Sequence, residues 1–195
     1  MNIEIKKNER IDDLEYKGLK IIQNTEGFCF GIDAVLLSDF AKEIKNNSKV
    51  LDLGTGTGIL SILLSGKTNL NKIYGIEIQE EVANMAQRSV QLNNLENKIE
   101  IINKNIKDLE NIFEKNSFDA IVTNPPYKKI NTGEKNEKEN KLISRHEVTA
   151  SLDDFIKISF NLLKDKGSFY MVHRPERLTE IIYKLKQNKL EPKII

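Results

Sequence analysis

Short apolar segments alternate along the chain with longer segments in which apolar residues recur every three or four positions. Short apolar runs predict strands, whereas the longer period predicts helices with one buried face. The expected strands are "LKIIQ" (19–23), "KVLDLG" (49–54), "KIYGIEI" (72–78), "KIEIIN" (98–103), "FDAIVTN" (118–124) and "SFYMVHR" (168–174). The segment "LEPKII" (190–195) looks like the start of a further strand that is cut off as it enters the sheet.

Between these strands lie the expected helices. One runs through residues 33–41, with Asp33 near its start, and others cover 57–66, 81–94 and 175–188. The helix over 151–167 begins with Ser151 and Asp154, a pair that resembles a capping box, and is expected to end at Gly167. Strands that alternate with helices predict an α/β fold with a doubly wound, mostly parallel sheet and helices on both faces.

Two parts of the chain are expected. Residues 1–47 form an N-terminal strand and helix extension that packs on the core, and residues 48–195 form the core domain. Within the core, the polar segment 128–144 is nearly free of large apolar residues, which predicts a mobile loop.

Composition narrows the classes of function. The net charge is +1, so overall charge favours neither nucleic acid nor a membrane surface as partner. Residues 157–195 carry nine Lys/Arg against four Asp/Glu, which fits either an anionic partner or a solvated helix face. The single cysteine, Cys29, excludes a disulfide framework, and no apolar run reaches the roughly 20 residues of a membrane span. We therefore expect a cytoplasmic protein with no metal site. The sequence leaves the oligomeric state open, and we favour a monomer.

A glycine-rich turn lies between the strand at 49–54 and the helix that follows. In "LDLGTGTGIL", Gly54, Gly56 and Gly58 let the backbone approach a ligand closely. Glu77 ends the next strand, 23 residues after Gly54, where a carboxylate can accept from both hydroxyls of a ribose. Asp52 can accept a hydrogen bond from the ammonium group of a cofactor, or it can cap the start of the following helix. The pattern predicts a dinucleotide or S-adenosylmethionine as cofactor, and Asp52 suits the zwitterion of S-adenosylmethionine.

The segment "DAIVTNPPYKK" leaves a buried strand and continues at once with Asn124, Pro125, Pro126 and Tyr127. Two consecutive prolines make this turn stiff and extended. It follows a strand on the same edge of the sheet as the glycine turn. If Asn124 Oδ1 and the Pro125 carbonyl accept the hydrogens of a planar amine, the nitrogen lone pair is aimed at a methyl donor, and Tyr127 offers a ring for stacking. This predicts a clamp for a planar amine.

The motifs "LDLGTGTGI", "GIEIQ" and "NPPY" resemble those of class I S-adenosylmethionine-dependent methyltransferases, which have a Rossmann-like fold. With "FCFGIDAVLLSDF", "RHE" and "VHRPERL", the chain resembles the tRNA adenine-N6 methyltransferases that act on the adenine 3′ of the anticodon in a valine tRNA. The resemblance runs from "ERIDDL" to "LEPK" and implies S-adenosylmethionine as cofactor and tRNA as partner. Proteins of that family continue for some tens of residues, so the last edge strands are expected to be truncated.

The resemblance also completes the candidate site. An acid is common in the family near Asn105, where it contacts the adenine of the cofactor, and Asn105 can still accept that hydrogen bond. Candidate RNA-binding residues on the same rim are Lys128, Lys129, Arg145, His173 and Arg174, of which the resemblance favours Arg145 and Arg174. The candidate cofactor residues are Asp52, Leu53, Gly54, Thr55, Gly56, Gly58, Glu77, Ile78, Asn105, Ile106 and Asn124.

Other functions share parts of this pattern. Similar turns occur in DNA adenine methylases, in guanine-N2 rRNA enzymes and in the enzymes that methylate a glutamine amide of release factors. The chain has no room for a DNA target-recognition domain, and the N-terminal extension is shorter than that of the glutamine enzymes. A dehydrogenase has no use for the NPPY turn, and a non-enzymatic binding scaffold needs neither that turn nor Glu77. The expected function is adenine-N6 methylation of tRNA.

Overall fold

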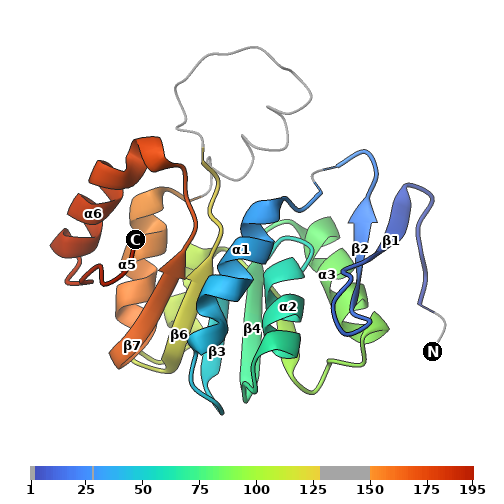
Figure 1. Ribbon diagram of the computed structural model, residues 1–195, viewed down its shortest axis with the longest axis horizontal. Helices are drawn as coiled ribbons and strands as arrows, with labels where there is room; N and C mark the ends of the chain where they lie inside the picture. Colours follow the sequence, from blue (N-terminus) through green and yellow to red (C-terminus); the bar gives the residue numbers. More distant parts are fainter. Residues whose placement is uncertain (1–2, 28, 128–149) are drawn as a thin grey trace.

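The computed structural model describes residues 3–27, 29–127 and 150–195 (Figure 1). Within them, the main sheet has five parallel strands in the order β5-β4-β3-β6-β7. These strands are β3 (Lys49–Leu53), β4 (Lys72–Glu77), β5 (Ile99–Asn103), β6 (Phe118–Thr123) and β7 (Leu163–Met171). The helices are α1 (Ile32–Phe40), α2 (Ile59–Lys67), α3 (Glu80–Leu92), α5 (Leu152–Leu162) and α6 (Leu178–Gln187), with 3-10 turns η1 (Ala41–Glu43), η2 (Ile106–Asn111) and η3 (Pro175–Arg177).

The strand order confirms the predicted doubly wound sheet. From β3 the chain moves outward through β4 to β5, and then returns to the other side of β3 to form β6 and β7. The direction of winding therefore switches between β3 and β6, whose last residues, Leu53 and Thr123, are paired. Ligands of such folds bind at the carboxyl ends of the strands beside this switch point. The segments that follow β3 and β6 therefore lie next to each other.

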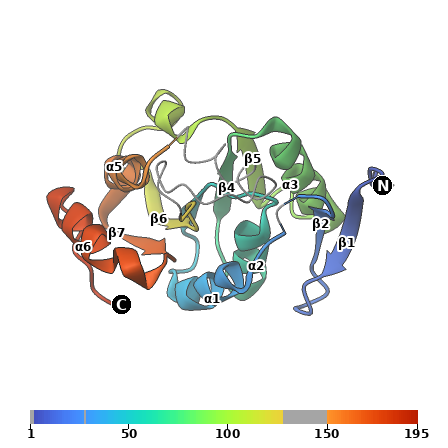
Figure 2. The ribbon, with the colours of Figure 1, turned by 90° about the horizontal axis from the view of Figure 1, so that it is seen from above.

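Both faces of the sheet are buried, as the apolar strands predicted. Val50 and Val122 pack on one face in a cluster with Leu37, from α1, and Leu60, from α2. Alternate residues of the same strands belong to a second cluster on the opposite face, which includes residues of η2 and α5. Figure 2 shows α1 and α2 on one side of the sheet and α5 on the other. The sheet is thus held rigidly between two layers, which fixes the positions of the strand ends.

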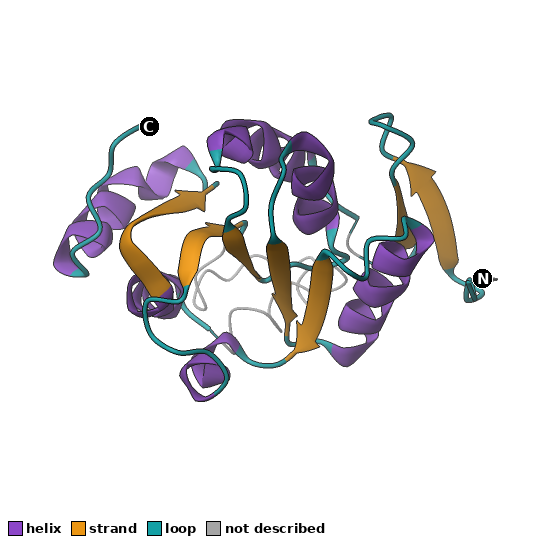
Figure 3. Cartoon of the chain, turned by 90° about the horizontal axis from the view of Figure 1, so that it is seen from below, coloured by secondary structure: helices purple, strands orange, loops and turns teal. Residues whose placement is uncertain are grey.

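A small antiparallel sheet precedes the core. It consists of β1 (Glu9–Asp13) and β2 (Lys20–Asn24) and is set apart from the main sheet, next to α3 (Figure 3). The Arg88 guanidinium of α3 donates to both carboxylate oxygens of Glu9 at 2.6 Å, and Ser89 Oγ accepts from the Ile22 N–H at 3.0 Å. The strand β1 was not predicted because Ile11 is its single apolar residue, so the sequence shows no alternating pattern there. The domain boundary near residue 47 stays a prediction.

The helix predicted over 151–167 ends earlier than expected. Ser151 forms the predicted capping box with Asp154, but α5 stops at Leu162, and β7 begins with Leu163. Leu163 has an extended backbone, is buried in the core and pairs with Phe118. The prediction was wrong for residues 163–167 because their spacing of apolar and charged residues is compatible with a helix, whereas burial of Leu163 between sheet and helix favours the strand.

The strand start expected at 190–195 is also wrong for the residues that the structure describes, since these residues join neither sheet. The Leu190 N–H donates to the Leu185 carbonyl at the end of α6, at 2.9 Å. The Leu190 side chain packs against a cluster that includes Ile156 and Ile181. The segment after α6 therefore covers helices rather than extending the sheet.

Candidate active site

The glycine-rich turn connects β3 to α2. Gly54, Gly56 and Gly58 all have positive φ, at 72°, 57° and 88°, which other residues rarely adopt. The turn is tied to β4 through the Thr55 N–H, which donates to the Ile76 carbonyl at 2.9 Å. A Cβ built on Gly56 would meet no atom within 4 Å, so the backbone of the turn faces open space at this residue.

Glu77, the last residue of β4, reaches this turn. One carboxylate oxygen accepts from the Gly56 N–H at 3.1 Å, and the other accepts from the Gln79 N–H at 2.8 Å. The residue is buried. The structure therefore brings together the turn and the acid that the sequence analysis paired, and the carboxylate also holds the turn in place. Ile78, the next residue, is half-buried at the same edge.

Asp52 lies inside the molecule below the turn. Its Oδ2 accepts from the Thr55 hydroxyl at 2.6 Å and from the Ser61 hydroxyl of α2 at 2.7 Å. Burial raises the pKa of Asp52 from 3.8 to about 6. Of the two alternatives for Asp52, these contacts match the one in which the carboxylate holds the start of the helix. Leu53 is fully buried beside it.

Asp52→Asn is expected to raise the free energy of unfolding at pH 7 by about 1–2 kcal/mol. A pKa raised from 3.8 to about 6 means that ionising the buried carboxyl costs about 3 kcal/mol in the folded protein. The amide removes this cost but adds N–H groups that need partners, which reduces the gain. The folded protein takes up the proton as the pH falls below 6, so the gain shrinks and vanishes near pH 4. Urea unfolding at several pH values measures it.

Asp119→Asn is the matched control, for which the expected change in the free energy of unfolding at pH 7 has the opposite sign. Partial burial raises the pKa of Asp119, but the ion pair with Lys164 and the hydrogen bond from the Lys49 N–H outweigh this effect, so that the pKa is lowered overall. This carboxylate stabilises the protein at pH 7 and loses that effect as the pH falls below 3.8, so its amide variant is expected to be less stable at pH 7. A loss of stability at pH 7 in Asp52→Asn would contradict the conclusion that ionisation of the buried Asp52 carboxyl destabilises the folded protein.

The loop after β5 contributes Asn105 and Ile106. Asn105 caps η2, where its Oδ1 accepts from the Lys107 N–H at 3.0 Å, and Ile106 is buried in the core. Asn103 Nδ2 donates to the carbonyls of Glu77 and Ile78, at 2.9 and 3.0 Å. The loops after β4 and β5 are therefore held together at the same edge as the glycine turn.

The Asn124–Tyr127 segment follows β6 directly. At the end of β6, the Thr123 hydroxyl donates to the Leu53 carbonyl at 2.8 Å, which fastens the two strand ends beside the switch point. Pro125 is buried, and the other three residues of the segment are half-buried. The Tyr127 hydroxyl lies 2.6 Å from Asn124 Oδ1. The structure thus places this segment at the same rim as the glycine turn.

Tyr127 is held from several directions. Its hydroxyl lies 2.7 Å from Asp33 Oδ2, in the first turn of α1, and its carbonyl lies 3.5 Å from Arg177 Nη1. The His173 ring lies 5.1 Å from the Tyr127 ring, and the Arg174 guanidinium lies 5.6 Å from it. Burial, and then the Asp33 carboxylate, raise the pKa of Tyr127, so the phenol keeps its proton at neutral pH. Neither Asp33 nor Arg177 was predicted as part of this site, because no local pattern connects them with Tyr127.

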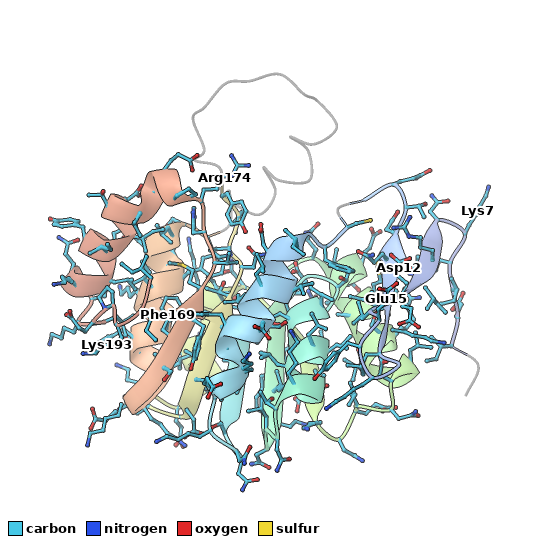
Figure 4. The ribbon with its side chains drawn as sticks, in the orientation of Figure 1. Lys7, Asp12, Glu15, Phe169, Arg174 and Lys193 are labelled. Atoms are coloured by element: carbon cyan, nitrogen blue, oxygen red, sulfur yellow. The ribbon has the colours of Figure 1, made fainter. Side chains whose placement is uncertain are left out.

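Two candidate RNA-binding residues are described by the structure, and both follow β7. Arg174 is exposed, and Figure 4 shows it at the end of the molecule where the strands terminate. His173 is half-buried, and its Nε2 has no hydrogen-bond partner among the described residues. Burial, and then the charge of Arg177, lower the pKa of His173, so its ring is neutral at pH 7. Lys128, Lys129, Arg145 and the predicted loop 128–144 lie outside the described residues.

The part of the chain that the structure describes offers neither a metal site nor a membrane-spanning helix. No group of three or more His, Cys, Asp or Glu side chains there is arranged to hold a metal ion. None of the described helices combines the length and the apolar character needed to cross a membrane.

Residues 32–188 match the family model of the methyltransferase small domain. A tRNA1(Val) (adenine(37)-N6)-methyltransferase of Porphyromonas gingivalis is 29% identical over 175 residues, which cover 87% of this chain and 68% of that protein. The protein of the same name from Haemophilus influenzae is 30% identical over 161 residues, which cover 78% of this chain and 68% of that protein.

Solved structures agree with the fold. TYW2 of M. jannaschii, in complex with AdoMet, aligns with a TM-score of 0.64 at 19% identity, over 94% of this chain and 74% of that chain. Trm5 of Methanocaldococcus jannaschii, in complex with adenosine, aligns with a TM-score of 0.67 at 16% identity, over 93% of this chain and 47% of that chain. These likenesses confirm the Rossmann-like fold. The chain belongs to the methyltransferase small domain family and to the family of the tRNA1(Val) (adenine(37)-N6)-methyltransferases.

Proposed function

We propose that this chain methylates the exocyclic N6 of an adenine in tRNA, with S-adenosylmethionine as methyl donor. The observation that carries the proposal is the placement of two motifs at one switch point. The glycine turn with Glu77 follows β3 and β4, and the Asn124–Tyr127 segment follows β6, the neighbour of β3 on its other side. The names of the relatives supply the nucleotide, adenine 37 of tRNA1(Val). Because tRNA is the substrate, we place the reaction in the cytoplasm.

The residues at the glycine turn fit S-adenosylmethionine. The open space beside Gly56 leaves room for a ligand against the backbone, and the Glu77 carboxylate lies beside it with lone pairs left for ribose hydroxyls. When bound, the cofactor supplies an electrophilic methyl group. Asp52 contributes to cofactor binding indirectly, because its hydrogen bonds with Thr55 and Ser61 hold the glycine turn in place. Asn124 borders this site without contributing to cofactor affinity, and the residues that we assign to the site itself are Asp52, Leu53, Gly54, Thr55, Gly56, Gly58, Glu77, Ile78, Asn105 and Ile106.

The Asn124–Tyr127 segment holds the target amine. The N6 lone pair of adenine is delocalised into the ring, which makes the nitrogen a poor nucleophile. Asn124 Oδ1 and the Pro125 carbonyl accept its two hydrogens, which fixes the nitrogen and directs its lone pair toward the methyl group. Burial of Pro125 and the stiffness of two consecutive prolines keep the Pro125 carbonyl in place. Tyr127 provides a ring on which the adenine stacks.

The rim around this segment is suited to RNA. Arg174 is exposed beside Tyr127, and a guanidinium in this position can contact a backbone phosphate next to the target base. An adenine in an anticodon loop is already unpaired, so it is turned outward at a lower cost than a base in a duplex. We assign the same phosphate-binding role to Lys128, Lys129, Arg145 and His173.

Methyl transfer to a panel of substrates tests the proposal. The protein is incubated with S-adenosylmethionine that carries a labelled methyl group and with unmodified tRNA, DNA or a release-factor protein, followed by nucleoside and peptide analysis. We expect label in tRNA alone, as N6-methyladenosine. Label in a glutamine of the release factor would move the chain to the glutamine methyltransferases, and label in DNA or at guanine N2 would also overturn the proposal.

A further inference from the structure

The Tyr127 hydroxyl lies between two oxygen atoms. Asp33 Oδ2 is 2.7 Å away and Asn124 Oδ1 is 2.6 Å away. A phenol has a single proton, so it can donate to only one of these oxygens. At the other contact, two oxygens would face each other without a proton between them, which is unfavourable at this distance. The arrangement is resolved only if one of the two partners offers a donor instead.

Asn124 is the partner that can do so. A carboxylate accepts a phenol proton more strongly than a neutral amide does, because the hydrogen bond is charge-assisted. The proton therefore goes to Asp33. The two ends of the Asn124 amide have nearly the same shape, so its partners decide its orientation. With the phenol proton committed to Asp33, the amide turns its Nδ2 toward the phenol oxygen and donates to it.

We propose that Asp33 is a positioning residue that, through the Tyr127 hydroxyl, fixes the orientation of the Asn124 amide and directs Oδ1 toward the target amine. This inference rests on the proposed function. Without Asp33, the phenol proton would go to Asn124 Oδ1 and occupy the acceptor that the amine needs. The acid of α1 therefore determines which end of an amide after β6 faces the substrate, although the two residues do not bond to each other.

The surroundings support this role because they hold both Asp33 and Tyr127 in place. We call the chain of contacts from Asp33 through the Tyr127 hydroxyl to Asn124 the relay. Asp33 lies in the first turn of α1, where the helix favours a negative charge, and the buried Ala34 and Leu37 fasten this helix to the core. Tyr127 is held at its ring by His173 and Arg174, as described above. The hydroxyl therefore keeps its place between Asp33 and Asn124, and the N-terminal extension takes part in the site.

A double-mutant cycle with Asp33→Ala and Tyr127→Phe tests the inference. Asp33→Ala is expected to lower kcat by about 30-fold, with the KM for tRNA and the Kd for S-adenosylmethionine unchanged within about twofold. Tyr127→Phe keeps the ring but removes the phenol proton, which in Asp33→Ala would be donated to Asn124 Oδ1. In that background Asp33→Ala is expected to cause no further loss beyond about twofold. Asp33→Asn, which preserves the shape of the side chain, is expected to lose about tenfold and guards against a folding defect in the alanine variant.

An equal loss from Asp33→Ala in both backgrounds would overturn the inference, as would a loss confined to KM or cofactor affinity. A second readout is independent of activity. In the wild-type protein, the side-chain amide protons of Asn124, assigned by their absence in Asn124→Ala, should be protected from exchange in an NMR spectrum. Asp33→Ala and Tyr127→Phe should each remove that protection. Protection that persists in Asp33→Ala would refute the relay even in an active enzyme, whereas an inactive wild-type protein would refute only the proposed function.

Discussion

Asn124→Ala is expected to lower kcat by about 10³-fold or more while leaving the affinity for S-adenosylmethionine nearly unchanged. The side chain lies at the end of β6 and contacts the Tyr127 hydroxyl, whereas the glycine turn and Glu77 are bonded to each other without it. Removing its amide takes away one of the two acceptors for the target amine. The interaction is needed in the transition state rather than in cofactor binding, so the loss should fall on kcat.

Single-turnover methylation of tRNA and calorimetric titration with S-adenosylmethionine measure the two quantities separately. Asn71→Ala is the matched control, because Asn71 is exposed and immediately precedes β4, at the opposite edge of the sheet. It should leave both quantities unchanged. A comparable loss of cofactor affinity in Asn124→Ala would contradict the role of this residue as an acceptor for the amine.

Glu77→Ala is expected to weaken S-adenosylmethionine binding by about 100-fold. Two effects add in the same direction. The carboxylate that would accept from the ribose hydroxyls is lost, and the N–H groups of Gly56 and Gln79 lose their shared partner. The turn is then free to leave the conformation that fits the cofactor. Titration of the variant with S-adenosylmethionine measures the change directly.

Glu77→Gln separates the two effects. Its amide oxygen can keep one of the two backbone hydrogen bonds, whereas its NH2 group cannot accept from a hydroxyl. We expect this variant to be weakened less than the alanine variant and to retain more of its stability toward urea. An affinity that stays at the wild-type value in both variants would refute the ribose role of Glu77.

The fold could be predicted from sequence wherever burial left a periodic pattern. The strands β3, β4, β5 and β6 are short, mostly apolar and separated by helical segments, and each was expected within one or two residues of its bounds. Prediction failed where local pattern and tertiary packing disagree. In β1, Ile11 is flanked by charged residues only, so this strand has no alternating apolar pattern. At Leu163 a helical period continues in the sequence, but pairing with Phe118 begins the strand β7.

The candidate site was predictable only in its local parts. The glycine turn, Glu77 and the Asn124–Tyr127 segment carry their signal in a few adjacent residues or in a fixed spacing. The contact between Asp33 and Tyr127 joins residues 94 positions apart, and no spacing rule connects them. Asp33 lies within a motif that resembles the family, yet the motif did not reveal its partner. The hydrogen bonds that buried Asp52 accepts from the hydroxyls of Thr55 and Ser61 likewise became visible only in three dimensions.

The most direct test of the central claim is methylation of one defined RNA. A transcript of tRNA1(Val) with adenine at position 37, the nucleotide in the names of the relatives, is compared with the same transcript carrying guanine there. We predict one methyl group per transcript, as N6-methyladenosine at that position, and none in the guanine variant. Methylation of both transcripts, or of a base other than adenine in the first, would contradict the account.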